Sequence, residues 1–366
     1  MTLIEHLSLV KETRSDINRR HDLVDVMFLV ISAIMAGAEG WRDIETYGDS
    51  KVDWLTRHRP FEGGIPRRHT IARILRSVVA ESLLEALLNW VNERRTHLGK
   101  PIIALDGKVL RGAYRGDVKK ALQLVTAYDV ENGLVLTQKS TPNKKSEIGT
   151  VRDILDTLNI KGAVVTVDAL HCQRETLIKI HEKKGHIVVQ VKANQPKLLN
   201  LVRSQFQAVF DVKKEKIITE VKQEAHGRKE ERYVFQLKAN FPEEIAAKWP
   251  TIRSIIAVER HRTVKGKIGS VETSYYVSSL SPRHKLIGHY IRQHWRIEST
   301  QHYILDVVFK EDASRIVMED AVENMALFRR FVMNMLKQHN CGAPSQRNKL
   351  KKAGWNDNYR AEVFFG

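Results

Sequence analysis

The sequence contains very little cysteine and no long hydrophobic run. Only Cys172 and Cys341 occur among its 366 residues, which excludes a disulfide framework and any zinc site of the four-cysteine type. The longest strongly apolar run without a charge, residues 26–38, is too short to cross a bilayer core, which needs about 20 residues. The first residues mix acids with bases and offer no small-residue cleavage site, so we expect no signal peptide. A soluble protein of a reducing cytoplasm is therefore expected, with no membrane partner.

Acidic residues are also scarce relative to basic ones. The chain has 43 Asp and Glu against 60 Lys and Arg, so its net charge is +17 and its isoelectric point is about 9.8. So large an excess of positive charge favours a polyanionic partner such as nucleic acid. Hydrophobic residues make up 42 % of the chain, which is enough for a sizeable core. At roughly 150 residues per domain, the length predicts two or three domains.

Residues 1–98 are predicted to form a helical N-terminal domain. Asp22 is placed to cap a helix over residues 23–38. Pro66 pre-sets the start of a second helix, whose apolar residues from Ile71 to Val78 share one face. A third helix is expected over residues 79–98. The arginines of the second helix indicate a small DNA-binding domain of helix-turn-helix character, and a bundle with a solvated basic face is the alternative.

The pattern changes to alternating strands and helices at Pro101, and we assign residues 99–337 to one core. Three strands are followed by helix, strand, helix, strand and helix, in the order 101–108, 122–130, 133–140, 146–158, 162–169, 172–185, 186–192 and 195–210. Meandering strands followed by right-handed crossovers build a mixed five-stranded sheet with helices on both faces. This α/β element order is that of a ribonuclease-H-like core.

The rest of the core contains an insertion and closing helices. Residues 211–282 are predicted to form a β-rich insertion, because ribbons with alternating charge are followed by two more strand-like runs. Helices are expected from about 282 to 305 and from 320 to 337. Residues 338–366 are predicted to form a basic C-terminal arm, since seven Lys or Arg but no acid lie between Glu323 and Asp357.

Two aspartates follow predicted strands that are neighbours in such a sheet. Asp106 ends the first strand and Asp168 ends the fourth, so we expect their carboxylates to converge. A third acid is expected from the closing helix, where Glu298 is placed for it. Simpler roles stay open at this point: Asp106-Gly107 also fits a turn, and Asp168 could cap the helix that follows.

Three converging carboxylates are what hard divalent cations require. Mg²⁺ takes oxygen ligands and retains water. Two such ions about 3.5–4 Å apart clamp the attacking and leaving oxygens of an in-line phosphoryl displacement. The pattern therefore predicts metal-assisted chemistry on phosphodiesters, in which the side chains act as ligands.

Six stretches follow one another in an order typical of one protein family. They are ALDGKVLRGA, NKKSEIGTVRDIL, VDALHCQ, VKANQPKL, HGRKEER and HWRIESTQHYILDVVFKEDASR. On these motifs the chain closely resembles the H-repeat-associated transposases, a bacterial insertion-sequence family with a DDE catalytic core. The resemblance covers nearly the whole chain and is most specific from about residue 101 to 335.

The resemblance implies a ribonuclease-H-like core whose catalytic and metal-binding carboxylates match Asp106, Asp168 and Glu298. It implies cleavage and strand transfer that depend on two Mg²⁺ ions, with Mn²⁺ as a substitute, at the ends of a mobile element. The partners implied are double-stranded DNA, as element ends and as target, and a second copy of the chain when two ends are synapsed. The expected location is the bacterial cytoplasm, associated with the nucleoid.

The chain departs from related insertion-sequence transposases around the glutamate. Where those carry Tyr, Arg and Lys, this sequence has Ile291, His294 and Leu305. The family usually has Asn after the glutamate and a His-Trp pair after it, whereas this chain has Ser299 and His302-Tyr303. These changes leave all three carboxylates in place and affect their fine positioning.

Further residues are candidates for DNA contact or for support of the carboxylates. Those expected to contact DNA are Lys108, Arg111, Lys144, Lys145, Lys192, Asn194, Gln195, Arg292 and Trp295. Those expected to support the glutamate are His294, His302 and Asp306. Three alternatives are open: Trp295 fits a core position as well as base stacking, Asp306 could pair with Arg315, and the four-residue spacing of the two histidines around Glu298 could bind zinc.

Three functions fit the sequence. The first is a DDE transposase. The second is a ribonuclease-H-like nuclease that cuts DNA without joining it. The third is a catalytically silent DNA-binding relic of a mobile element, against which the intact carboxylates argue.

Overall fold

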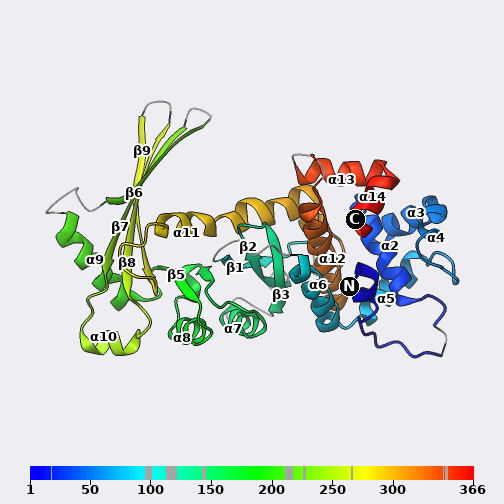
Figure 1. Cartoon of the computed structure of the whole chain (residues 1–366), viewed down its shortest axis with the longest axis horizontal. Coiled ribbons are helices and arrows are strands. Elements are labelled where there is room, and N and C mark those ends of the chain that lie inside the picture. Colours follow the sequence, from blue (N-terminus) through cyan, green and yellow to red (C-terminus); the bar gives the residue numbers. More distant parts are fainter. Residues whose placement is uncertain are drawn as a thin grey trace. The chain divides into compact units, whose positions relative to one another are not determined.

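The chain folds into two compact units (Figure 1). This computed structural model describes residues 1–17, 19–94, 101–112, 122–141, 146–210, 217–225, 228–264, 267–340, 342 and 345–366. The first unit comprises Met1–Thr96, Gly107–Glu147 and Glu298–Gly366, and the second comprises His97–Asp106 and Ile148–Ile297. The boundaries expected at residues 98 and 337 do not coincide with these units. Segment 107–147 and the C-terminal helices group with the N-terminal helices instead.

A mixed β-sheet forms the second unit, with hydrogen-bonded strands in the order β1-β4-β5-β9-β8-β7-β6. The strands are β1 (Ile102–Val109), β4 (Val164–Val167), β5 (His186–Val191), β6 (Ile217–Ala225), β7 (Arg228–Lys238), β8 (Ser254–Val264) and β9 (Lys267–Ser278). Strand β1 pairs in parallel with β4, and β4 with β5. The remaining pairs are antiparallel, and β9 continues the sheet directly beside β5. The expected β-rich insertion is therefore an extension of the core sheet.

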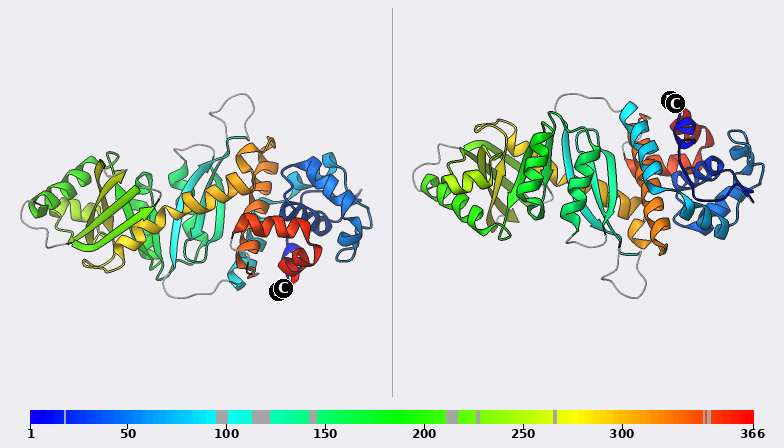
Figure 2. Two further views of the ribbon diagram at one scale, coloured as in Figure 1. Left: turned by 90° about the horizontal axis from the view of Figure 1, so that it is seen from above. Right: turned by 90° about the horizontal axis from the view of Figure 1, so that it is seen from below.

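Helices cover both faces of this sheet, as the sequence predicts. Those of the unit are α7 (Glu147–Thr157), α8 (Arg174–Glu182), α9 (Pro196–Phe210), α10 (Glu243–Lys248) and α11 (Ile287–His294), with a short turn η2 (Ala169–His171). Helices α7 and α8 lie on one face, and α11 crosses the other (Figures 1 and 2). Strand β4 is buried along its whole length, which explains its continuous apolar run.

The first unit is mainly helical and centres on α12 (Glu319–Gln338). Its other elements are α1 (Leu3–Leu7), α2 (Leu23–Met35), α3 (Trp41–Ser50), α4 (Val52–Thr56), α5 (Arg68–Ser77), α6 (Ala80–Arg94), β2 (Gln123–Asp129), β3 (Leu134–Thr141), η4 (Ile297–His302), η5 (Ile304–Val308), η6 (Glu311–Ala313), α13 (Gln346–Trp355) and α14 (Asp357–Phe365). Helix α12 contacts α2, α5, α6 and β3, and it is buried along most of its length.

The N-terminal helices agree with the sequence in part. Asp22 caps α2 as expected, its Oδ1 accepting a hydrogen bond from the Asp25 N–H at 3.0 Å. Helix α2 ends at Met35, three residues early, and Gly37 turns the chain with φ +94°. Residues 57–67 separate α4 from α5, which is longer than the three- or four-residue turn of a helix-turn-helix. The arginine-bearing helix α5 therefore exists, but without the short turn before it.

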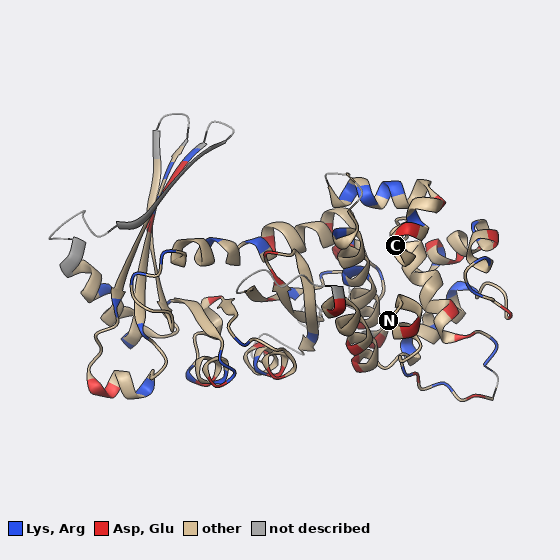
Figure 3. Cartoon of the chain, in the orientation of Figure 1, with Lys and Arg blue, Asp and Glu red and all other residues tan. Residues whose placement is uncertain are grey.

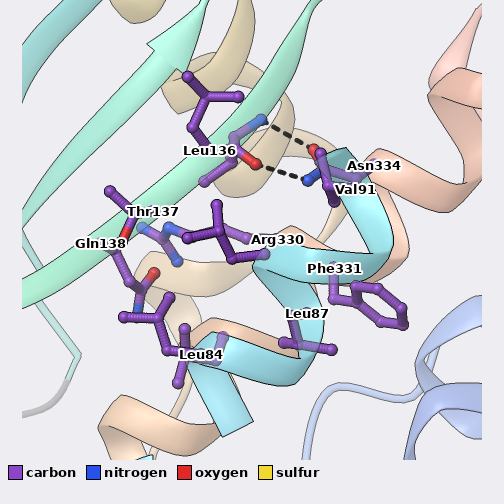
Figure 4. Close-up of a pocket in the computed structure, with 12 residues that line it drawn as sticks. Leu84, Leu87, Val91, Leu136, Thr137, Gln138, Arg330, Phe331 and Asn334 are labelled. Atoms are coloured by element: carbon purple, nitrogen blue, oxygen red, sulfur yellow. Dashed lines mark hydrogen bonds between the residues drawn. The ribbon is translucent and has the colours of Figure 1, made fainter. Parts of the chain in front are cut away.

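Strand β3 is attached to α12 by a side-chain amide. Asn334 of α12 donates to the Val135 carbonyl at 2.7 Å and accepts from the Val135 N–H at 2.9 Å. This pairing satisfies backbone groups of β3 that face no further strand. A small cavity lies beside it between α6, β3 and α12, lined mostly by apolar side chains such as Leu87, Leu136 and Phe331 (Figure 4).

The C-terminal segment is folded onto the N-terminal helices of the same unit. Helix α14 places Phe364 against Phe28 of α2, with ring centroids 4.8 Å apart. The buried Arg360 guanidinium stacks on Trp54 at 4.1 Å and donates to the Ala353 carbonyl at 2.8 Å and to Asp357 Oδ1 at 2.6 Å. The described residues of segment 338–366, which the sequence predicts as a basic C-terminal arm, are thus packed into the first unit.

The predicted fold class is confirmed: the chain is α/β, with a ribonuclease-H-like mixed sheet, a β-rich insertion and an all-α N-terminal region. Among the residues that the structure describes, no helix is both long and apolar enough to span a membrane.

Arg360 is expected to contribute strongly to the stability of the first unit. Replacement Arg360→Ala removes its stacking on Trp54, a buried hydrogen bond to Ala353 and a partly buried one to Asp357, so the free energy of unfolding should fall by about 2–4 kcal/mol. Chemical denaturation measures this change. The exposed arginine variant Arg347→Ala is the control and should stay within about 0.5 kcal/mol of the wild type. Equal stability of the two variants would contradict the role assigned to Arg360.

Candidate active site

Asp106 and Asp168 lie side by side at one edge of the second unit's sheet. The register of the parallel pair β1–β4 places Leu105 opposite Val167, and each aspartate is the next residue of its chain. Neighbouring strands run about 4.8 Å apart, so the two residues are adjacent and share a face of the sheet. The register thus puts the two aspartates at neighbouring positions, and the convergence of their carboxylates stays a prediction.

The Asp106-Gly107 pair is not a turn, because β1 continues through it to Val109. Gly107 serves a packing purpose in the first unit. A Cβ atom at this position would lie 2.5 Å from Oε1 of the buried Glu147. Only glycine therefore lets the Glu147 carboxylate approach the strand this closely.

Asp168 caps the short 3₁₀ helix η2. It therefore has the capping role that the sequence analysis gave as the alternative to a catalytic one. Its Oδ1 accepts from the Leu170 N–H at 3.0 Å and lies 3.7 Å from Nε2 of the buried His171. About half of the Asp168 side chain remains exposed, at 49 %. A capping carboxylate of this kind still has a second oxygen to offer to a ligand.

The loop after β5 supports the Asp168 turn. The Asn194 amide donates to the Ala169 carbonyl at 2.7 Å, and the Gln195 amide donates to the Cys172 carbonyl at 2.9 Å. Both residues were expected to contact DNA, whereas here their donors join two loops. Lys192, in the same loop, is exposed.

The buried Cys172 is not a candidate nucleophile. Burial raises the pKa of the Cys172 thiol to about 12, which makes it a poor nucleophile.

Helix α11 brings His294 to β4, the strand that Asp168 follows. His294 Nδ1 lies 3.2 Å from Oγ1 of Thr166, which is two residues before Asp168 in β4. Burial lowers the pKa of His294 to about 4, although the Asp168 charge opposes this shift, so the imidazole is neutral at pH 7. The next residue, Trp295, is 49 % exposed and makes an edge contact with His294. The core position considered for Trp295 is thus not what the structure has, and Arg292 is half-buried on the same helix.

Glu298 is exposed and belongs to the first unit, in a π-helical segment, η4, that follows α11 along the chain. π-Helical segments are rare in proteins, but where they occur they often lie at functional sites. Within the described part of the chain, no group of three or more His, Cys, Asp or Glu side chains is arranged to hold a metal ion. The backbone register accordingly brings only Asp106 and Asp168 to neighbouring positions, and the place of Glu298 beside them stays a prediction.

Lys108 is the centre of a buried charge cluster in the first unit. Its ammonium lies 3.0 Å from Glu311 Oε2 and 3.4 Å from Asp312 Oδ1, and it also pairs with Asp306. Arg330 contacts Glu311 through both terminal nitrogens, at 2.5 and 3.3 Å. Lys108 is 8 % exposed and its charge is met by carboxylates, so it is not available to a phosphate as the sequence suggested.

The charges of this cluster shift the pKa values of its members. Burial alone would raise the pKa of Glu311, but the Arg330 and Lys108 charges lower it to about 2. Burial raises the pKa of Asp306 against the effect of Lys108. Burial and then the two cations lower the pKa of His302 to about 3. Asp306 and His302 thus belong to this cluster, and the partner of Asp306 is Lys108 and not Arg315.

The remaining candidates differ in exposure. Arg111 is exposed, with its Nε 3.8 Å from Asp312 Oδ2. Lys144 and Lys145 lie outside the described residues. Arg330 was not anticipated, because nothing in the pattern of α12 distinguishes a buried arginine from an exposed one.

Two models of known protein families match this chain. The model of the family "Transposase DDE domain" matches residues 97–335, and "DDE_Tnp_1-associated" matches residues 4–91. The chain therefore belongs to the DDE-domain transposases.

Relatives that match this chain over nearly its full length are named as transposases. The "Putative transposase YncI" of Escherichia coli O157:H7 is 32 % identical over 99 % of this chain and 94 % of its own length. The "H repeat-associated putative transposase YhhI" of Escherichia coli K12 is 30 % identical over 100 % and 98 %, respectively. The resemblance to H-repeat-associated transposases is thus confirmed. A solved piggyBac transposase synaptic complex with hairpin DNA aligns over 99 % of this chain and 76 % of that one, with a TM-score of 0.43 and 10 % identity.

The buried cluster predicts a dependence of stability on Glu311 and on pH. Glu311→Gln leaves Lys108 and Arg330 short of a carboxylate, so the free energy of unfolding at pH 7 should fall by about 3–5 kcal/mol. The pKa of Glu311 is lowered in the folded state, so its contribution is complete above its ordinary pKa of 4.5 and is lost as the pH falls toward about 2.

Denaturation of both proteins between pH 2 and pH 7 tests this. The difference between wild type and variant should shrink below about pH 4.5. A difference that stays constant over this range would contradict the assignment of the charge to Glu311.

Proposed function

We propose that this protein cleaves DNA at the ends of an insertion sequence and joins them to a target, using Asp106, Asp168 and Glu298 as its carboxylates. The observation that carries the proposal is the backbone register that puts Asp106 of β1 and Asp168, the residue after β4, at neighbouring positions in a chain of the DDE-domain family. Glu298 is assigned by its motif, and it follows His294, which contacts β4, by four residues along the chain.

Asp106 and Asp168 fit the needs of Mg²⁺. This ion is bound in proteins through one or two carboxylates together with substrate phosphates and water, and a pair of aspartates on neighbouring strands provides the protein's share. When bound, the metal would supply charge stabilisation at the reacting phosphate and a lowered pKa of the attacking oxygen. The family implies a divalent metal, and Mg²⁺ is the ion we propose, with Mn²⁺ as a substitute.

The residues around the two aspartates have positioning roles in this proposal. Asn194 and Gln195 hold the backbone that follows Asp168, and the neutral His294 packs against β4 without adding a positive charge. The exposed side chains of Lys192, Arg111 and Trp295 are available to DNA phosphates and to an unpaired base. Two element ends must meet during transposition, so we propose a homodimer in the synapsed state.

Replacement of Asp106 tests its role in DNA cleavage separately from DNA binding. Asp106→Asn keeps the size of the side chain but removes its charge, so cleavage and joining should both fall about 10³-fold or more while DNA affinity is retained. The assay supplies labelled element-end DNA with Mg²⁺ and follows nicked and joined products. Asp53→Asn, at an exposed position of α4, is the matched control and should keep full activity. Cleavage retained by Asp106→Asn would refute the site.

The same assay separates the three functions. Cleavage without joined product indicates the nuclease. DNA binding without either product, together with no heat of Mg²⁺ binding in calorimetry, indicates the silent relic. Cleavage followed by joining is the outcome we expect.

Asn194 tests whether the loop positions Asp168 or contacts DNA. Because its amide holds the Ala169 carbonyl, Asn194→Ala should lower the cleavage rate about 10–100-fold with little change in DNA affinity. A direct contact would show the opposite pattern, with weaker binding and an unchanged rate at saturating DNA. Lys192→Ala provides the comparison, since its exposed ammonium should affect binding first.

A further inference from the structure

Helix α13 carries an exposed basic face that lies beyond the residues matched by either family model. We propose that this face is a second DNA-binding surface. It would bind backbone phosphates of the DNA that lie away from the phosphodiester at the proposed catalytic carboxylates. Its residues are Arg347, Asn348, Lys351, Lys352 and Trp355. The inference rests on the proposed function, because DNA is the substrate there.

The inner face of α13 fixes its orientation in the first unit. Lys349 donates to the carbonyls of Leu336 and His339, at 2.8 and 2.6 Å, and so caps the end of α12. Leu350 and Ala353 are buried, and Ser345 caps the start of the helix. These contacts leave the other side of α13 to solvent, because the inner residues recur at helical spacing.

A close approach to α2 holds the other end of the helix. A Cβ atom at Gly354 would lie 3.2 Å from the Ala36 carbonyl oxygen, which is tighter than ordinary contact. A glycine at this position therefore lets α13 seat on the end of α2. The outer face is accordingly part of a packed surface and not of a mobile tail.

The outer face combines cations with one aromatic ring. Among the described residues, Arg347, Lys351 and Lys352 have no carboxylate within ion-pair distance, in contrast to Lys108. Trp355 is 79 % exposed, and the Lys351 ammonium lies 5.8 Å from its ring centroid. Figure 3 shows the basic residues gathered along α13. The Lys352 ammonium also lies 4.5 Å from the ring centroid of Tyr359. Cations without a carboxylate partner beside an exposed aromatic ring are the elements that bind a nucleic-acid backbone and stack on a base.

The position of α13 suits this role. Helix α13 contacts η5, the segment that follows η4 and Glu298 in the same unit. DNA phosphates held on α13 would therefore be close to the chain segment that carries the third carboxylate. A membrane surface fits less well, because an interfacial helix needs a broad apolar face and here Leu350 and Ala353 are turned into the protein.

A triple variant tests the surface in the full-length protein. Arg347→Ala, Lys351→Ala and Lys352→Ala together remove three positive charges, and the control removes one arginine and two lysines from other exposed positions, Arg253→Ala, Lys161→Ala and Lys248→Ala. Affinity for a fluorescent element-end duplex is measured by anisotropy in EDTA across a salt series, so that no catalysis is needed. We expect the α13 variant to bind at least about tenfold more weakly, with a salt slope smaller by about 2–3, and the control to change little.

The outcomes separate this inference from the proposed function. If the wild type does not bind DNA at all, the proposed function fails first. If the wild type binds and the α13 variant binds with the same affinity and salt slope, the α13 surface is refuted while the proposed function stands. Loss of binding to anionic phosphatidylserine vesicles, with DNA binding unchanged, would also refute it.

Tryptophan fluorescence tests the stacking position. Binding of a duplex with an unpaired terminal base should quench the wild type more than Trp355→Phe, because Trp355 is the more exposed of the two exposed tryptophans. Trp295→Phe is the matched comparison and reports the other exposed ring. Equal quenching of wild type and Trp355→Phe would overturn the assignment of stacking to α13.

Discussion

The parallel pairing of β1 with β4 is the constraint on which the proposed site depends. Because Leu105 and Val167 are partners in the ladder, the next residue of each strand must lie at the same level and on the same face. A slip of one residue would send one carboxylate to the opposite face of the sheet. Continuous burial of β4 resists such a slip, since its whole length is packed in the core.

The strand pattern made the neighbouring positions of Asp106 and Asp168 predictable, whereas their surroundings depend on contacts distant in sequence. Asp106 and Asp168 follow apolar runs whose order alone defines the neighbours. Lys108 lies in the same motif as Asp106, but its ammonium is buried because it pairs with Glu311, which is 203 positions away in the sequence. Local pattern gives no information about such a pair, because a lysine after a strand fits a solvated loop and a buried ion pair equally well. The roles of Asn194 and Gln195 were missed for the same reason: their partners are backbone carbonyls of another loop.

Helix and strand positions were predictable where periodicity was strong, and less so where packing decided them. The apolar run of α2, the cap at Asp22 and the hairpin between β2 and β3 all follow local rules. The insertion was recognised as β-rich, but only the pairing of β9 with β5 makes it part of the core sheet. The basic C-terminal segment was expected as an arm because its charge suggested solvent. Arg360, Tyr359 and Phe364 are buried there instead, and their burial folds α13 and α14 back onto the N-terminal helices.

The net charge of +17 is therefore a poor guide to the surface that DNA would meet. Lys108, which the sequence suggested for DNA contact, is neutralised in the interior by the buried Glu311, and so is Arg330, which the sequence did not single out. A cation can attract a phosphate only if it is exposed and its field is not cancelled by a nearby acid. On α13, the inward contacts fix the helix, and the nearest acid along the chain, Asp357, pairs with Lys51 and Arg360 and not with the outer cations. The distribution of carboxylates, more than that of lysines and arginines, decides where this chain can hold a polyanion.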